Sequence, residues 1–243
     1  MKAEMTATPS DTAADDSEAT TVGARDTIMA VTEGLTYCIR AGQLVPGQHL
    51  VEADLTQRFG VSRGSLREGL KQLNADGIVT LSRFRGAFIA ALDRKGVSDL
   101  LDVLEPLCTL AARLAALHCH DAQAHAALRE EAQTLVRHSE TGGRAAYLES
   151  RRRFYDHLIE MGGNSELGRV IPLARTDLFR AQFSTVQTKE QHRRHARGYI
   201  KIAEAVAEND AGKAERAVRK HFAGTRATLD LLAESAFAVA GRG

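Results

Sequence analysis

Hydrophobic residues recur at three- and four-residue spacing over most of this chain, which is the pattern of helices that bury one face. The first such stretch covers residues 24–42. Its apolar positions are Ile28, Val31, Leu35 and Ile39, and Gly42 ends it. Residues 1–22, by contrast, carry few large apolar side chains and have one Lys against five acids. This composition predicts a disordered tail before the first helix.

Two shorter helical stretches follow a turn at Pro46-Gly47, and Gly60 separates them. Ser62 is a favoured N-cap residue for the second stretch, which Gly77 ends. The apolar stripe of this second stretch is formed by Leu66, Leu70 and Leu73. The pattern is typical of a helix-turn-helix unit.

The segments at 78–81 and 87–90 alternate in polarity around a basic turn, which predicts a two-stranded wing. Residues 23–91 are therefore expected to form a winged helix-turn-helix domain, followed by a linker at 92–96. Strand signals then cease, and residues 97–240 are expected to form an all-helical bundle of about six helices. Its predicted helices cover residues 97–119, 121–140, 144–161, 165–180, 189–208 and 211–239.

The composition agrees with a mainly α protein. Hydrophobic residues make up 44% of the 243 positions and charged residues 26%, whereas aromatic residues make up 5% and Trp is missing. A wholly disordered or fibrous chain is excluded. Because the net charge is +1, a surface for nucleic acid would have to arise from the local placement of basic residues.

No stretch of the sequence approaches the ~20 apolar residues that span a bilayer, and the N-terminus lacks the apolar segment of a signal peptide. The three cysteines show no spacing typical of a zinc site or a disulfide framework. We therefore expect a cytoplasmic protein with no membrane partner.

Basic residues follow one face of the helix that begins after Ser62. Arg63, Arg67 and Lys71 are four positions apart, beside the leucine stripe, so this side can meet a DNA duplex while the apolar side packs. The candidate DNA-contacting residues are Ser62, Arg63, Gly64, Ser65, Arg67 and Lys71 on this helix, with Arg83, Arg85 and Gly86 in the wing. On an isolated helix such charges would be only a solvated face; the adjoining turn, helix pair and wing favour DNA binding.

The stretch "GQLVPGQHLVEADLTQRFGVSRGSLREGLKQLNADGIVTLSRFRGAFIA" resembles the winged helix-turn-helix of the GntR family of bacterial transcription regulators. The segments "LEPLCTLAARLAA", "FYDHLIEMGGN" and "AEAVAENDAGKAERAVRKHF" are similar to the ligand-binding FCD domain of the FadR-like branch. The resemblance covers residues 24 to about 226. It implies that Arg63 and Arg67 contact bases and phosphates and that Arg85-Gly86 is the wing contact. Ala53 and Gly64 stand where the family often has a basic residue and a Thr or Ser.

Many FCD domains hold a divalent metal with one Asp and three His. The resemblance places these four ligands at Arg151, Tyr155, Tyr199 and His221, so only the last retains its type. A cation at position 151 opposes metal binding by its charge. We therefore expect no metal at the family site and no other cofactor.

The same substitutions predict a different kind of site. Arg151 and Tyr155 lie one turn apart on one helix, and an Arg fork with phenol and imidazole groups suits a carboxylate or a phosphate. The candidate effector-binding residues are Arg151, Tyr155, Tyr199, His221 and His195. In the alternative interpretation, Arg151 belongs to an exposed basic run and the tyrosines only fill the old cavity. Leu101 stands where the family often has an Arg for ligand carboxylates.

These features predict a DNA-binding transcription regulator, a repressor acting as a homodimer on a double-stranded operator, with a small organic acid as its effector. One alternative is a metal-dependent regulator with a displaced site at His195 and His221. Another is a metal- or His-based hydrolase, which no nucleophile–base spacing and no phosphate-binding glycine loop supports. We expect a regulator and no enzyme.

Overall fold

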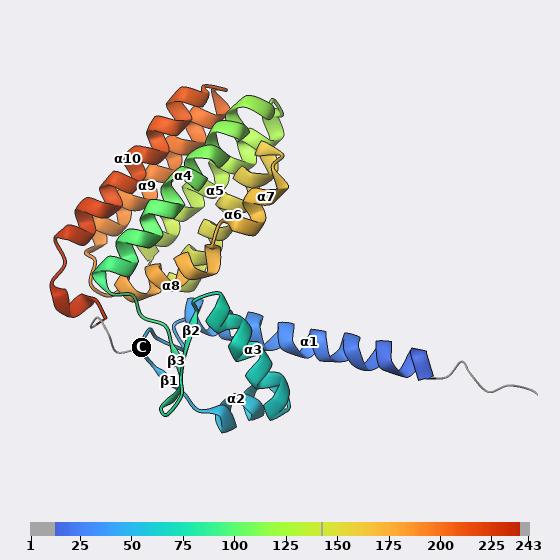
Figure 1. Ribbon diagram of the computed structural model, residues 1–243. Helices are drawn as coiled ribbons and strands as arrows, with labels where there is room; N and C mark the ends of the chain where they lie inside the picture. Colours follow the sequence, from blue (N-terminus) through green and yellow to red (C-terminus); the bar gives the residue numbers. More distant parts are fainter. Residues whose placement is uncertain (1–12, 142, 239–243) are drawn as a thin grey trace, which may run out of the picture.

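The computed structural model describes residues 13–141 and 143–238, with the backbone alone for residues 13–25. A bundle of long helices stands above a smaller N-terminal domain, and the first part of α1 extends sideways away from both (Figure 1). The mainly α class and the order of the two domains agree with the sequence prediction. Among the described residues, no helix is long and apolar enough to cross a membrane.

The N-terminal domain contains three helices and a small sheet. Its elements are α1 (Ala13–Arg40), β1 (His49–Leu50), α2 (Glu52–Phe59), α3 (Arg63–Ala75), β2 (Val79–Ser82) and β3 (Gly86–Ile89). Helix α1 begins well before residue 24, so residues 13–22, which the sequence assigned to a disordered tail, are helical. Large apolar residues are few in this segment, but Ala13, Ala14, Glu18 and Ala19 have a high intrinsic helix propensity. Residues 1–12 of that predicted tail lie outside the described residues.

Helices α2 and α3 form the predicted helix-turn-helix. Gly60 ends α2 in the left-handed conformation, with a φ of 64°, which glycine adopts without strain. Ser62 caps α3 as predicted, because its hydroxyl accepts a hydrogen bond from the backbone N–H of Ser65. The leucine stripe of α3 is buried against α1, and a β-carbon at Gly69 would lie 2.6 Å from Val31 Cγ1. Helix α3 is therefore fixed closely on α1, with its other face outward.

The wing sheet has three strands rather than the predicted two. All pairs are antiparallel in the order β1-β3-β2, with Leu50 opposite Ala87 and Leu81 also opposite Ala87 on the other side. Strand β1 is only two residues long, too short to show an alternating pattern in the sequence. Strand β1 adds an edge strand to the wing sheet, directly after the Pro46-Gly47 turn.

The described residues of the C-terminal domain form seven α-helices and one 3-10 turn. These are α4 (Arg94–His118), α5 (Ala122–Thr141), α6 (Arg144–Gly162), α7 (Ser165–Val170), α8 (Leu173–Phe183), α9 (Lys189–Ala207), α10 (Ala211–Asp230) and η1 (Glu234–Ala236). The predicted helix at 165–180 is in fact α7 and α8, because Pro172 interrupts the backbone hydrogen bonding between them. The last helix ends at Asp230, short of the predicted residue 239.

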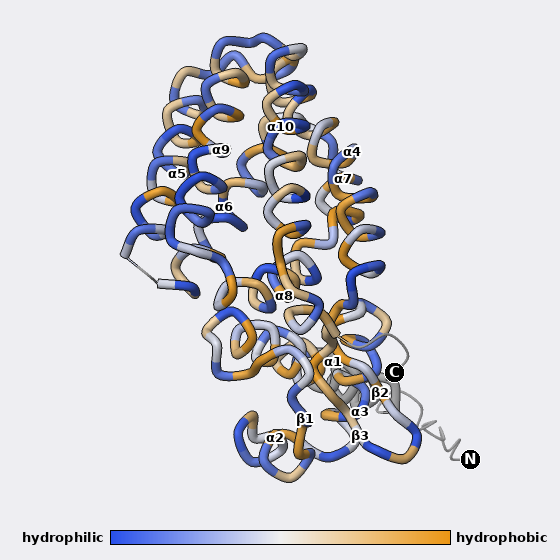
Figure 2. Tube along the Cα trace, turned by 90° about the vertical axis from the view of Figure 1, so that its left-hand side faces the viewer, coloured by the Kyte–Doolittle hydropathy of each residue, from blue (hydrophilic) through white to orange (hydrophobic). Residues whose placement is uncertain are grey.

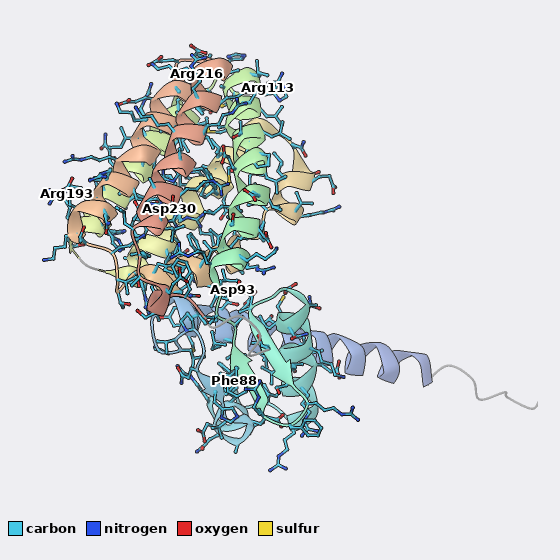
Figure 3. The ribbon with its side chains drawn as sticks, turned by 60° about the vertical axis from the view of Figure 1, so that its left-hand side comes forward. Phe88, Asp93, Arg113, Arg193, Arg216 and Asp230 are labelled. Atoms are coloured by element: carbon cyan, nitrogen blue, oxygen red, sulfur yellow. The ribbon has the colours of Figure 1, made fainter. Side chains whose placement is uncertain are left out.

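The connection between the domains is shorter than the predicted linker at 92–96. Asp93 caps α4 through a hydrogen bond from Gly96 N, so the helix already begins at Arg94. Asp93 accordingly lies at the junction of the two domains (Figure 3). The Gln182 side chain accepts from Leu92 N and donates to Leu92 O, both at 2.8 Å, which ties α8 to this connection.

Helix α8 lies across the lower end of the bundle, next to the N-terminal domain (Figure 2). Leu178 and Ala181 of α8 belong to the core of the N-terminal domain, whereas Phe179 and Phe183 belong to the core of the bundle. One short helix thus contributes to both cores. Helix α8 is therefore a direct packing connection between the bundle and the N-terminal domain.

Candidate functional site

The basic face of α3 is exposed at the outer side of the N-terminal domain. We call the six residues Ser62, Arg63, Gly64, Ser65, Arg67 and Lys71 the reading face. All are exposed except Ser65, which is half-buried. Arg63 is the first residue of the helix, and its guanidinium forms no ion pair with any residue that the structure describes. The start of a helix also favours anions, because the first backbone N–H groups have no partner within the helix.

Two cations of the reading face have acidic neighbours. Arg67 Nε lies 3.2 Å from a Glu52 carboxylate oxygen, and Lys71 Nζ lies 2.7 Å from Glu68. Both pairs are exposed, so water screens them and their contribution to stability is small. A phosphate could replace either acid as partner. Sequence reasoning did not foresee that Glu52, at the start of α2, holds Arg67 in place.

The wing tip carries the other predicted DNA contacts. Arg83 and Arg85 are exposed in the turn between β2 and β3, and Gly86, the exposed first residue of β3, has a φ of 82°. Phe84, between the two arginines, is 91% exposed, an unusual position for an aromatic side chain. Sequence analysis did not select Phe84, although an exposed apolar residue between cations suits the insertion between base steps seen in minor-groove contacts.

Inside the bundle, the structure brings together the five predicted effector residues, Arg151, Tyr155, Tyr199, His221 and His195, which we call the polar cluster. Arg151 is 2% exposed, so it does not belong to a solvated basic run. Its Nε donates to the Tyr199 hydroxyl at 3.0 Å, and its guanidinium lies 4.8 Å from the centre of the Tyr155 ring. Arg151 thus contacts both tyrosines.

The two histidines of the polar cluster face each other with ring centres 4.3 Å apart. Burial and the nearby arginines lower the pKa of His221 to about 3 and that of His195 well below its usual value. Both rings are therefore neutral at pH 7. His195 Nδ1 lies 2.7 Å from the hydroxyl of Tyr147, a residue that sequence reasoning missed.

Asp177 and Arg180 of α8 are two further charged residues that the sequence did not indicate. Asp177 is buried, and its carboxylate lies 3.5 Å from Arg151 Nη1 and 4.0 Å from Arg40 Nη1 of α1. Burial raises the pKa of Asp177 to about 6, against the opposing effect of these arginines. Arg151 therefore already has an internal counter-ion, and that counter-ion also faces the N-terminal domain.

The side chains at the family's metal position do not fit a metal ion. The Arg151 guanidinium lies among the groups that would be the ligands, and the nearby carboxylate of Asp177 is paired with it. Within residues 13–141 and 143–238, no group of three His, Cys, Asp or Glu side chains is arranged to hold a metal ion. His195 and His221 alone supply two nitrogen donors and no carboxylate.

A cavity of about 630 Å³ opens beside the polar cluster, at the boundary between the two domains. We call it the boundary pocket. Its lining includes Arg180, Tyr147, His195 and Arg144. Ala41 and Gly42, just after α1, line it from the N-terminal domain. The pocket was not predicted, because its walls come from segments far apart in the sequence.

A winged helix-turn-helix with an exposed basic helix, joined to a helical domain, is typical of a DNA-binding transcription regulator. The family described as "Bacterial regulatory proteins, gntR family" matches residues 27–89, and the FCD domain matches residues 99–224. The chain belongs to the GntR family and carries an FCD domain. It is a regulator and not an enzyme.

Individual proteins agree with this assignment. The chain is 27% identical to the Nta operon transcriptional regulator of Aminobacter aminovorans over 180 residues, which cover 73% of this chain and 84% of that protein. Over 65 residues, 26% of this chain and 28% of that protein, it is 38% identical to the galactonate operon transcriptional repressor of Escherichia coli (strain K12). The solved structure of E. coli McbR/YncC has the same fold, with a TM-score of 0.73 at 18% identity over 84% of this chain and 97% of that chain.

Proposed function

We propose that this regulator is a repressor that binds a two-fold operator as a homodimer and leaves it when a small organic acid binds the helical domain. The observation that carries the proposal is the pairing of an exposed basic reading face with an enclosed polar cluster next to a pocket. The similar galactonate operon protein is named a repressor. We place this regulator in the cytoplasm, where the operator DNA is found.

In this proposal Arg63 reads a base edge, because it is exposed at the first turn of α3 and its planar fork can reach guanine O6 and N7 together. Arg67 and Lys71 bind phosphates once they leave Glu52 and Glu68. Arg83, Arg85 and Gly86 bring the wing tip to the neighbouring minor groove. Ser62 and Ser65 supply short donors to the backbone.

An apolar stripe on α4 supports the homodimer. Val103, Leu110 and Leu117 are seven residues apart and are exposed on the bundle surface. Hydrophobic residues at this spacing follow one side of a helix, and a second copy packed along it would remove them from water. Two reading faces related by a two-fold axis would then contact two half-sites.

The effector site is proposed to work without metal. Arg151 holds the position of the family's Asp ligand, and the two neutral histidines lack a carboxylate partner for an ion. Native mass spectrometry of the protein purified without chelator tests both points. A dimer with no added metal mass is expected. A monomer, or a dimer carrying one zinc per chain, contradicts this part of the proposal.

DNA recognition is tested by selecting duplexes from a random library and measuring affinity for the selected sequence at several salt concentrations. A two-fold symmetric sequence should emerge. The logarithm of the affinity should fall steeply with the logarithm of the salt concentration, because each phosphate contact releases counterions. Failure to enrich any sequence, or an affinity that does not depend on salt, contradicts the assignment of the reading face.

A further inference from the structure

Two arginines of the bundle, the buried Arg151 and the half-buried Arg180, differ in how their charge is balanced. Arg151 is paired with Asp177, and the Asp177 carboxylate also lies within ion-pair distance of Arg40. Arg180 approaches no carboxylate within ion-pair distance in the described part of the chain. Because a buried cation without a counter-ion is costly, the region around Arg180 has a positive charge that an anion would neutralise.

The contacts of Arg180 leave part of its guanidinium unused. NH2 lies 3.4 Å from Thr225 Oγ1, and the group stacks 4.9 Å from the centre of the Phe179 ring. Nε is buried and has no hydrogen-bond partner among the residues that the structure describes, and the same is true of His195 Nε2. Both residues line the boundary pocket. Buried donors are normally paired with protein, ordered water or a ligand, and an anion in the pocket would supply the partner here.

The rest of the pocket wall is also cationic. Arg144 and Lys189 line it and make no ion pair with any described residue. Its one acid, Glu140, is paired with Arg193 at 3.2 Å. Arg180 contacts Thr225 of α10, whereas Arg144 lies against Gly42 of the N-terminal domain, so positive charge is available at two places in the pocket wall.

We propose that the boundary pocket binds an organic acid with two anionic groups, one held by Arg180 and the other by Arg144. This inference rests on the proposed function and assigns the acid's site and class. The carboxylate on Arg180 meets the unpaired Nε and accepts a second hydrogen bond from His195 Nε2–H, whose Nδ1 accepts from the Tyr147 hydroxyl. The cation that binds the ligand is therefore Arg180, whereas Arg151, already neutralised by Asp177, orients Tyr199 beside it.

The position of the pocket gives the acid a direct route to the reading face. Ala41 and Gly42 form part of its wall, and a β-carbon at Gly42 would collide with the Arg144 guanidinium. The end of α1 therefore packs directly on the residue that holds the second anionic group. An acid that draws Arg144 inward changes this contact, and α3, packed on α1, moves with it. The ligand acts to the extent that it binds one domain arrangement more tightly.

Thermal unfolding of the full chain with defined acids tests this inference. The probes are succinate and glutarate, which carry two negative charges, and citrate, which carries three. Butyrate, with one charge, and succinamide, with none, are the controls. Sodium chloride is added so that all samples have the same ionic strength. At a concentration about 100 times its dissociation constant, a diacid should raise Tm by about 5 °C or more. Butyrate should raise it less, and succinamide should leave it unchanged.

Variants locate the site. Arg180→Gln should abolish the Tm shift, and Arg144→Gln should reduce the diacid shift to that of butyrate. Arg144 is half-buried at the pocket side, so its variant tests the site even if Arg180→Gln does not fold. Arg169→Gln, on the exposed surface of α7, is the matched control and should respond as the wild type does. A shift that persists in both pocket variants, or no shift with any acid in the wild type, overturns the inference.

Operator affinity separates this inference from the proposed function. If acids release the operator equally from wild type and both pocket variants, the proposed function holds and the boundary pocket is the wrong site. If the Tm shifts depend on Arg180 but no acid alters operator affinity, the site stands and regulation by an acid is wrong. If no acid shifts Tm or alters affinity, both fail.

Discussion

The reading face of α3 and the polar cluster of the bundle both rely on arginine, but in opposite surroundings. Arg63 lies in water at the start of a helix, whereas Arg151 is enclosed by a tyrosine ring, a tyrosine hydroxyl and the Asp177 carboxylate. The charge of Arg63 is available to a partner outside the protein. The charge of Arg151 is needed inside the bundle, where it is paired with Asp177. Removal of an arginine should therefore affect DNA binding alone in one region and folding in the other.

The largest effect is expected when the internal counter-ion is removed. Asp177→Ala leaves Arg151 without its carboxylate and also takes the partner of Arg40, so the free energy of unfolding should fall by about 3–5 kcal/mol. Urea unfolding followed by circular dichroism measures it. Glu166→Ala, which breaks an exposed pair with Arg169, is the matched control and should cost less than about 1 kcal/mol. Equal losses in the two variants would show that the buried pair is not stabilising.

Arg63→Ala should weaken DNA binding and leave the free energy of unfolding unchanged. Loss of a two-pronged contact to a base costs about 1–3 kcal/mol of binding free energy in each half-site, and the preference at one operator position should relax. Urea unfolding should not change, because the side chain is exposed and packs on nothing that supports α3. Fluorescence anisotropy with the selected duplex measures the affinity. An unchanged affinity would mean that another residue reads the base.

The two regions also differ in how far the sequence predicted them. The Ser62 cap, the Gly60 turn and the leucine stripe depend on residues close together in the chain, and the structure confirms them. The two-residue strand β1 was missed because so short a segment has no pattern. The grouping of the polar cluster followed from resemblance to a family, not from spacing. Asp177 and Arg180 looked like ordinary helix residues, since their partners lie on other helices.

Acid should destabilise the bundle through His221. Its pKa is about 3 in the folded protein, against about 6.5 in an unfolded chain, so the unfolded state takes up its proton first. The stabilising contribution is present above pH 6.5 and is lost as the pH falls, by about 2 kcal/mol at pH 5. His195 adds to this loss. Asp177 opposes it, because a raised carboxyl pKa favours the folded state as the pH falls below 6.

The check is the free energy of unfolding in urea at pH 7, 6 and 5. The wild type should lose stability steadily, and His221→Gln, which cannot take up a proton, should show a shallower dependence. Equal slopes in the two proteins would mean that His221 is protonated in the folded state and that the polar cluster is open to water.

The smallest expected effect concerns Ser62, where a structural role and a DNA-contacting role fall on one side chain. Ser62→Ala removes the hydrogen bond from Ser65 N and should lower the free energy of unfolding by about 1 kcal/mol. Ser62→Asn should restore most of that loss, because Asn also caps helices. If the operator affinity recovers together with the stability, Ser62 acts by fixing the first turn of α3, and with it the direction of Arg63. If the affinity stays low in Ser62→Asn while the stability recovers, the serine hydroxyl itself contacts the DNA backbone.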